Sequence, residues 1–234
     1  MKNIFLIILM LMGVQLFAQK QVDKQDLLWV RYDFQLKTKQ FKLQQEIEER
    51  VYTNLRPHQL LIRTSIHKKL NPFLSGNIGF CYFEQTVPQD PDTSLIVMRQ
   101  ELRPHFTLSM KNSMTEKWSF EQRLMNELRF FEEGNNTFPY GNFRVRYQAQ
   151  TNHQIKDKWR LTVFDEVMFN LGNDVVFNSF DQNRLGAFVR YSPNKVWSLD
   201  LGYFNWYQQL TTGSDYVSRN ILRFTVHHTL LSKS

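Results

Sequence analysis

Apolar and polar residues alternate along most of this chain. In 143–149 (FRVRYQA) the apolar residues stand at odd positions, with Arg144 and Arg146 between them. The same period of two recurs in 96–109 and in 184–191. Because a β-strand sends successive side chains to opposite faces, each segment predicts a strand with one apolar and one strongly polar face.

About eleven segments show this alternation, and most of them run for ten to fifteen residues. Strands in soluble sheets average about five or six residues, whereas a tilted strand needs about nine to eleven to cross a bilayer. Length therefore favours an all-β fold, an antiparallel up-and-down transmembrane β-barrel of about 10–12 strands. The expected strands lie near 27–37, 40–53, 58–69, 73–86, 95–110, 117–131, 141–152, 158–171, 180–192, 196–209 and 217–231.

Short and long connections alternate between these segments. Four short links each carry a lysine shortly before an aromatic residue at the entrance to the next strand, namely Phe41, Trp118, Trp159 and Trp197. Short turns on one side, long loops on the other and aromatic residues at one rim are typical of an outer-membrane barrel, whose amphipathic rings lie at the lipid headgroups. We therefore expect these four residues to form an aromatic girdle. The alternative is that each ring only covers a soluble core.

The number of strands raises a difficulty. Both termini of single-chain bacterial barrels normally lie on the periplasmic side, which requires an even number. The segments from 40 to 231 already make ten, and 27–37 would be an eleventh that starts on the long-loop side. Three arrangements stay open: this segment pairs without completing the wall, the tail threads the lumen, or the chain holds a twelfth strand.

The first eighteen residues have the organisation of a secretory signal peptide. Lys2 precedes an apolar run from Ile4 to Met12, and Ala18 stands before a polar stretch. The run is too short to anchor the chain in a bilayer, so 1–18 is predicted to be a cleaved signal peptide and 19–234 a single outer-membrane barrel domain. We expect the mature chain in the outer membrane of a Gram-negative bacterium.

Composition changes this picture little. A mean hydropathy of -0.45 with 22% charged residues excludes a multi-helix membrane protein, and 15% aromatic residues exclude a disordered chain. The net charge of +7 would ordinarily suggest a nucleic-acid partner. Here the lysines cluster at the short turns, the arginines lie within strands, and the chain is exported. Outer-membrane lipid is therefore the expected partner, and nucleic acid is not.

Six strand motifs stand out, namely ELRPHF at 101–106, FEQRLMNELRFFEE at 120–133, FRVRY at 143–147, FDEVMFN at 164–170, FDQNRLGAFVRY at 180–191 and LDLGYFNWYQ at 199–208. These motifs resemble those of an uncharacterised, domain-of-unknown-function family of Gram-negative outer-membrane β-barrel proteins. The resemblance covers roughly residues 27–231 and implies the location and the fold, with no activity, substrate or cofactor attached to it.

The polar strand faces are predicted to line the lumen with alternating carboxylates and guanidiniums. Arginine suits this position because its planar group binds carboxylates through two parallel hydrogen bonds and stays charged. Such a ladder either fills a narrow lumen, which the intermediate strand number favours, or acts as a selectivity lining that prefers a small anionic or polar solute. Its expected members are Arg99, Glu101, Arg103, His105, Arg123, Glu127, Arg129, Arg144, Arg146, Glu166, Arg184 and Arg190.

Enzymatic chemistry is the rival class. Acyl hydrolysis needs a nucleophile activated by a histidine, and the six histidines are scattered with no nucleophile motif beside them. His105 is the one to examine, and an ordinary lumenal role explains it more simply. Cys81 is the only cysteine and is expected to be a small strand residue. The sequence thus predicts a non-enzymatic barrel without metal or cofactor, structural or a narrow passive pore; the alternatives are an outer-membrane lipid-modifying enzyme and a soluble exported ligand-binding barrel.

Overall fold

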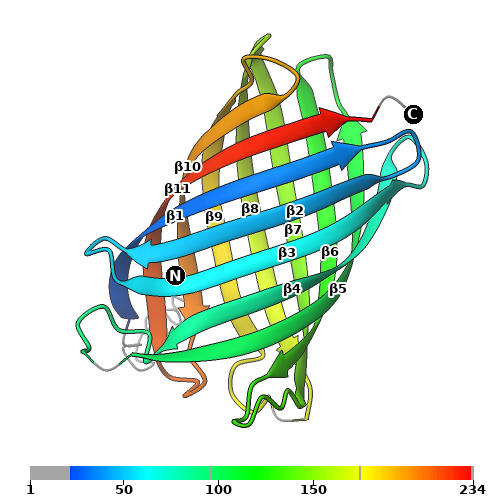
Figure 1. Cartoon of the computed structure of the whole chain (residues 1–234). Helices are drawn as coiled ribbons and strands as arrows, with labels where there is room; N and C mark the ends of the chain where they lie inside the picture. Colours follow the sequence, from blue (N-terminus) through cyan, green and yellow to red (C-terminus); the bar gives the residue numbers. More distant parts are fainter. Residues whose placement is uncertain (1–21, 95, 174, 233–234) are drawn as a thin grey trace, which may run out of the picture.

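Eleven β-strands form the wall of a closed barrel in the computed structural model, which describes residues 22–94, 96–173 and 175–232 (Figure 1). The predicted signal peptide, 1–18, lies outside the described residues. None of the described residues belongs to a helix long and apolar enough to cross a membrane. The strands are β1 (Val22–Lys37), β2 (Lys42–Tyr52), β3 (Pro57–Lys69), β4 (Leu74–Val87), β5 (Val97–Ser113), β6 (Trp118–Phe131), β7 (Tyr140–Lys156), β8 (Trp159–Leu171), β9 (Phe180–Tyr191), β10 (Trp197–Gln209) and β11 (Tyr216–Leu231).

Consecutive strands pair antiparallel, and the wall closes through a parallel pairing of β1 with β11. The parallel register runs from Val22 opposite Tyr216 to Lys37 opposite Leu231. An odd number of alternating strands makes the first and last strand point the same way, so their seam must be parallel. Closure also gives both edges of β1 a hydrogen-bonding neighbour, which a strand in lipid requires.

This closure corrects the expectations for segment 27–37. The segment starts earlier, at Val22, and is a full strand of the wall, so the arrangements in which it leaves the wall open or threads the lumen are wrong. The described residues hold no twelfth strand. The eleven predicted segments otherwise agree with the observed strands to within a few residues, because the alternation that predicted them is the strand geometry itself.

The two ends of the barrel differ. We call the end formed by 38–41, 70–73, 114–117, 157–158 and 192–196 the short-turn rim. The end formed by 53–56, 88–94, 96, 132–139, 172–173, 175–179 and 210–215 is the long-loop rim. β1 begins at the long-loop rim, whereas β11 ends at the short-turn rim, beside the end of β1 in Figure 1. The two ends of the described chain therefore lie at opposite rims.

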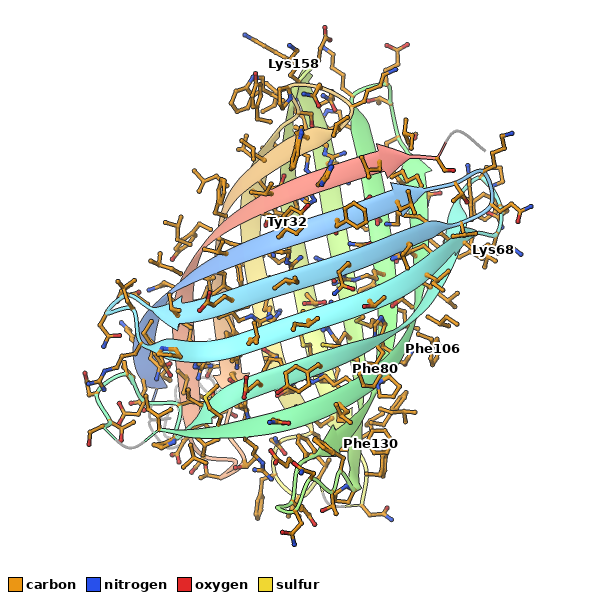
Figure 2. The ribbon with its side chains drawn as sticks, viewed as in Figure 1. Tyr32, Lys68, Phe80, Phe106, Phe130 and Lys158 are labelled. Atoms are coloured by element: carbon orange, nitrogen blue, oxygen red, sulfur yellow. The ribbon has the colours of Figure 1, made fainter. Side chains whose placement is uncertain are left out.

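Large apolar side chains cover the outside of the wall. Tyr32, Phe80 and Phe106 point away from the barrel in Figure 2, and Ile78 is 67% exposed. The inward positions of the same strands carry buried charged and polar groups instead, as Glu101 and Arg103 do on β5. This polarity is the reverse of a soluble ligand-binding barrel, in which the apolar face lines the interior. It matches a wall that meets lipid outside.

Candidate functional site in the barrel lumen

A cavity of about 1080 Å³ occupies the half of the lumen next to the long-loop rim. Its walls combine the loop segment 88–92 with inward side chains of the strands. On β1, β3, β5 and β7, the lining residues nearest the short-turn rim are Arg31, Arg63, Arg103 and Arg146. Beyond them, no described residue of these four strands lines the cavity. We call this space the lumenal cavity. The arginines that line it are Arg31, Arg50, Arg63, Arg99, Arg103, Arg129, Arg144, Arg146, Arg184 and Arg219.

The inner end of the lumenal cavity is crossed by a chain of ion pairs. Arg63 on β3 lies 3.7 Å from Glu127 on β6, which also pairs with Arg146 on β7 at 3.3 Å. Arg146 continues to Glu166 on β8 at 3.0 Å, and Glu166 binds Arg123 at 2.6 Å. We call these five residues the ion-pair belt. Because β4 and β5 separate β3 from β6 in the wall, the contact of Arg63 with Glu127 crosses the lumen, whereas the contacts of Arg146 join neighbouring strands.

Burial shows how tightly the belt fills this level of the barrel. Glu127 is 0% exposed, and Glu166 and Arg146 are also buried. Glu127 accepts further from Arg144, whose Nη2 lies 2.7 Å from it. Burial of a carboxylate costs desolvation free energy. Hydrogen bonds in fixed geometry from several guanidinium groups offset this cost. The belt therefore places buried charged side chains inside the lumen at this level.

Positive charge exceeds negative charge in this network. Among the described residues, ten lumenal arginines form ion pairs with only seven carboxylates. Several arginines therefore share one acid, as Arg103 and Arg129 share Glu101. In a lumen of low dielectric constant such an excess attracts anions.

The structure places all twelve members of the predicted charge ladder on the inner side of the wall. It brings together three groups, centred on Glu101, Glu127 and Glu166. Arg190 lies apart from them, paired with Asp200 toward the short-turn rim. Arg99 is exposed at the long-loop rim, 5.7 Å from the ring of Phe131. The ladder comprises Arg99, Glu101, Arg103, His105, Arg123, Glu127, Arg129, Arg144, Arg146, Glu166, Arg184 and Arg190.

His105 is buried beside Gly79 of the neighbouring strand. Neither ring nitrogen has a hydrogen-bond partner among the described residues, and a Cβ at position 79 would lie 2.7 Å from the imidazole. The glycine thus leaves room for the ring. No serine or threonine hydroxyl is hydrogen-bonded to His105 in the described part of the chain.

A second histidine, which sequence reasoning passed over, bridges two carboxylates. His227 on β11 lies 2.7 Å from Asp33 through Nδ1 and 2.8 Å from Asp200 through Nε2. These contacts tie β1, β10 and β11 together across the seam. No group of three residues suited to hold a metal ion occurs within the described ranges. Cys81 is buried in the lumenal face of β4.

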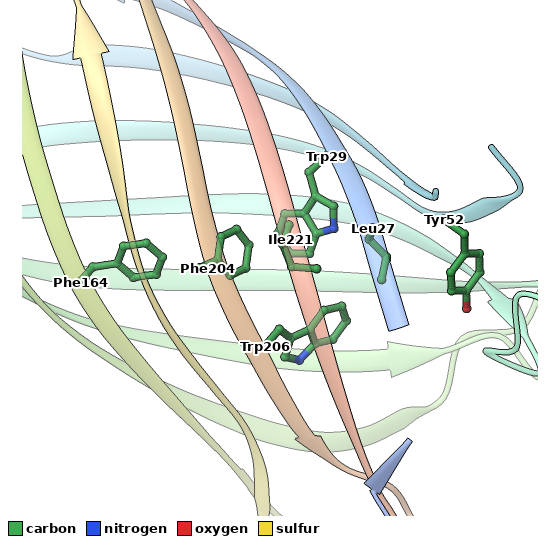
Figure 3. Close-up of a cluster of buried hydrophobic side chains, with 7 residues drawn as sticks. All are labelled: Leu27, Trp29, Tyr52, Phe164, Phe204, Trp206 and Ile221. Carbon is green, nitrogen blue, oxygen red and sulfur yellow. The ribbon is translucent and has the colours of Figure 1, made fainter. Parts of the chain in front are cut away.

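An apolar cluster also faces the lumen, which the alternation did not predict. Polar strand faces were expected to line the lumen, yet seven apolar side chains gather inside the barrel beside the seam (Figure 3). Trp29 packs edge-on against Phe204 and Trp206, with ring centroids 4.9 and 5.8 Å apart. The only sign of them in the sequence was that they lie an even number of positions from inward charged residues of their strands, such as Arg31 and Asp200. The cluster consists of Leu27, Trp29, Tyr52, Phe164, Phe204, Trp206 and Ile221.

The predicted charge ladder omitted other lumenal residues. They lie on strands for which the prediction gave a range but named no lumenal side chains. Arg31, Arg50 and Arg63 on β1 to β3 pair with Glu46 and Glu48. The alternation in 40–53 and 58–69 would have identified them by the same parity argument. Arg219 on β11 belongs to this group as well.

The four residues of the predicted girdle lie together at the short-turn rim. Trp118, Trp159 and Trp197 are the first residues of β6, β8 and β10, and Phe41 directly precedes β2. All four are 40–45% exposed. Lysines lie at the same rim, as Lys68 and Lys158 do in Figure 2.

Comparison with known proteins supplies a family. Residues 27–217 match the family described as "Protein of unknown function (DUF2490)". None of the curated proteins compared with the chain matches it. Among solved structures it is similar to one described as "NanC porin structure in rhombohedral crystal form", with 12% identity and a TM-score of 0.45, over 82% of this chain and 94% of that chain. The family match confirms the resemblance predicted from the Glu/Arg strand motifs, and because it extends over more than half of the sequence, the chain belongs to the DUF2490 family.

Proposed function

We propose that this protein is an outer-membrane β-barrel of a Gram-negative bacterium that forms a narrow passive pore preferring anions. The apolar outer face supports the membrane location, as do strands of 11 to 17 residues. These are long enough to cross a bilayer with tilt. The short turns then face the periplasm and the long loops face outward.

The observation that carries the anion preference is the excess of lumenal arginine over carboxylate. Ten paired arginines against seven acids leave the lumen positive, and Arg219 adds a buried guanidinium bonded to amide oxygens. Rings of arginine favour anions by compensating the loss of their hydration. A solute would enter the lumenal cavity from the long-loop rim and meet the belt at its inner end.

The same belt favours a second candidate, a filled barrel with a structural role. Glu127 and its guanidinium partners leave water little room at that level. Single-channel recording in planar bilayers separates the two candidates, using full-length protein purified from outer membranes and shown to be folded by its heat-dependent mobility on gels.

We expect small unitary currents in potassium chloride and a reversal potential of anion-selective sign across a salt gradient. Folded protein that gives no current steps would overturn the pore in favour of the structural role. Cation selectivity would overturn the anion preference.

A further inference from the structure

Three arginines of the lumenal cavity surround two tryptophan rings near the seam. The guanidinium carbon of Arg50 lies 3.8 Å from the ring centroid of Trp29. Arg184 lies 5.3 Å from Trp29 and 4.9 Å from Trp206, and Arg219 lies 4.3 Å from Trp206. Both rings are seen in Figure 3. The aromatic faces attract the cations, and Trp206 lies between Arg184 and Arg219, which are its neighbours on the two adjacent strands.

Carboxylates are scarce beside these three groups. Arg219 donates from Nε to Gln25 at 2.8 Å, from Nη1 to Gln208 at 2.6 Å and from Nη2 to Gln89 at 2.8 Å. These three hydrogen bonds therefore all end on amide oxygens.

Arg184 is only slightly better neutralised. It donates to the amide of Gln182 at 3.1 Å, and its ion-pair contact with Glu166 is long, at 3.9 Å. Its Nε is buried without a hydrogen-bond partner among the described residues. Of the three arginines, Arg50 alone has a close ion pair, with Glu48.

The opposite wall of the cavity shows the contrast. There Arg103 binds both oxygens of Glu101, at 2.7 and 2.6 Å. An amide oxygen is a weaker partner for a guanidinium than an ionised oxygen. Acids therefore compensate the charges of Arg184 and Arg219 only in part, since the ion-pair contact of Arg184 is long and Arg219 donates to amide oxygens, and an oxyanion would complement the charge that is left.

One of the amide partners comes from a loop. Gln89 belongs to the connection between β4 and β5, and this connection folds over the cavity mouth, where Gln25 donates to the Gln89 carbonyl at 3.0 Å. The loop is held from the other side by Arg56, which donates to the carbonyl of Pro91 at 3.0 Å. The Gln89 side chain thus covers Arg219, which is 0% exposed.

We propose that Arg184 and Arg219 form a binding subsite for a dianionic oxyanion, a sulfate or phosphate group free or carried by a small solute. The side-chain oxygen of Gln89 occupies the position of one anion oxygen while the subsite is empty, and an entering anion displaces it. This inference deepens the proposed pore, because it names the class of anion and the place where it stops.

The test measures binding rather than conduction. Full-length protein in detergent is titrated with potassium sulfate against potassium chloride at constant ionic strength, and binding is followed by calorimetry and by tryptophan fluorescence. We expect saturable sulfate binding that chloride does not reproduce. Binding that does not saturate, or that chloride matches, would overturn the subsite.

Two variants should change the affinity in opposite directions. Arg184→Gln removes a charged partner and is expected to weaken sulfate binding about tenfold. Gln89→Ala removes the internal competitor and is expected to strengthen it several-fold, which loss of a merely structural contact would not do. The matched control is Arg160→Gln, an inward arginine of β8 outside the cavity lining.

Each result decides one point. Equal weakening by Arg160→Gln and Arg184→Gln would show general charge attraction and overturn the subsite. An unchanged or lower affinity of Gln89→Ala would overturn the competition by the loop. Sulfate binding without current steps would support the subsite and overturn the proposed pore. Anion-selective currents without sulfate binding would support the pore and overturn the subsite.

Discussion

Arg63 and Glu127 meet across the lumen at 3.7 Å, although β4 and β5 lie between their strands in the wall. Glu127 is the centre of this connection, because Arg144 and Arg146 bind it from β7 at the same time. The barrel interior is thereby braced by side chains, in addition to the hydrogen bonds of its wall.

Replacing Glu127 with Gln should destabilise the barrel. Three guanidiniums would lose their shared carboxylate while staying buried, and removal of one member of a buried ion pair typically costs about 3–5 kcal/mol. Unfolding in urea, followed by the loss of heat-dependent gel mobility, measures the change. Glu116→Gln in an exposed short turn is the control and should unfold like the parent. A Glu127→Gln protein with the parent's urea midpoint would show that the belt contributes no stability.

Ion selectivity should respond to Arg129, which lines the lumenal cavity and shares Glu101 with Arg103. Arg129→Gln removes one positive charge from the cavity wall and leaves Glu101 paired with Arg103, so the reversal potential should move toward that of a non-selective pore. Lys68→Gln, at the exposed short-turn rim, should leave it unchanged. Equal shifts in both variants would assign the selectivity to overall protein charge rather than to the lumen.

The two ends of β1 should lie on opposite sides of the membrane. Lys24 is near its start at the long-loop rim and Lys39 follows its end in a short turn, and both are exposed. In a background with Cys81→Ser, Lys24→Cys should react with an impermeant maleimide on intact cells, and Lys39→Cys only after the outer membrane is opened. Reaction of both positions on intact cells would contradict a membrane-spanning β1.

The parallel seam predicts one disulfide pairing and excludes another. Val30 lies opposite Phe224 in the register of β1 and β11, and both side chains are exposed on the outer face. Cysteines at these positions should cross-link under mild oxidation in the same Cys81→Ser background. Cysteines at Val30 and Leu230 should not, because six residues along a strand separate them by roughly 20 Å. Cross-linking between positions 30 and 230, but not between positions 30 and 224, would show that β1 and β11 pair in a different register.

Local sequence determined the strands and the inward position of the charged ladder. In 143–149 each residue's face follows from its position alone, because successive side chains of a strand point to opposite sides. Arg144 and Arg146 could therefore be assigned to one face, and Glu127 and Arg129 to the corresponding face of their strand. The lysine-aromatic links likewise predicted which ends of the strands are joined by short turns, since a turn depends on neighbouring residues.

Tertiary structure decided what joins distant residues. The seam pairs Val22 with Tyr216, and no local pattern states which strand lies next to the first one. The contact between Arg63 and Glu127 depends on the curvature of the closed wall, which brings non-neighbouring strands within reach of long side chains. Period two places Trp29 on the face of Arg31, but it does not determine which inward apolar residues pack together. Trp29 and Trp206 pack inside because closure places their strands on either side of β11, where two rings can cover each other and three arginines.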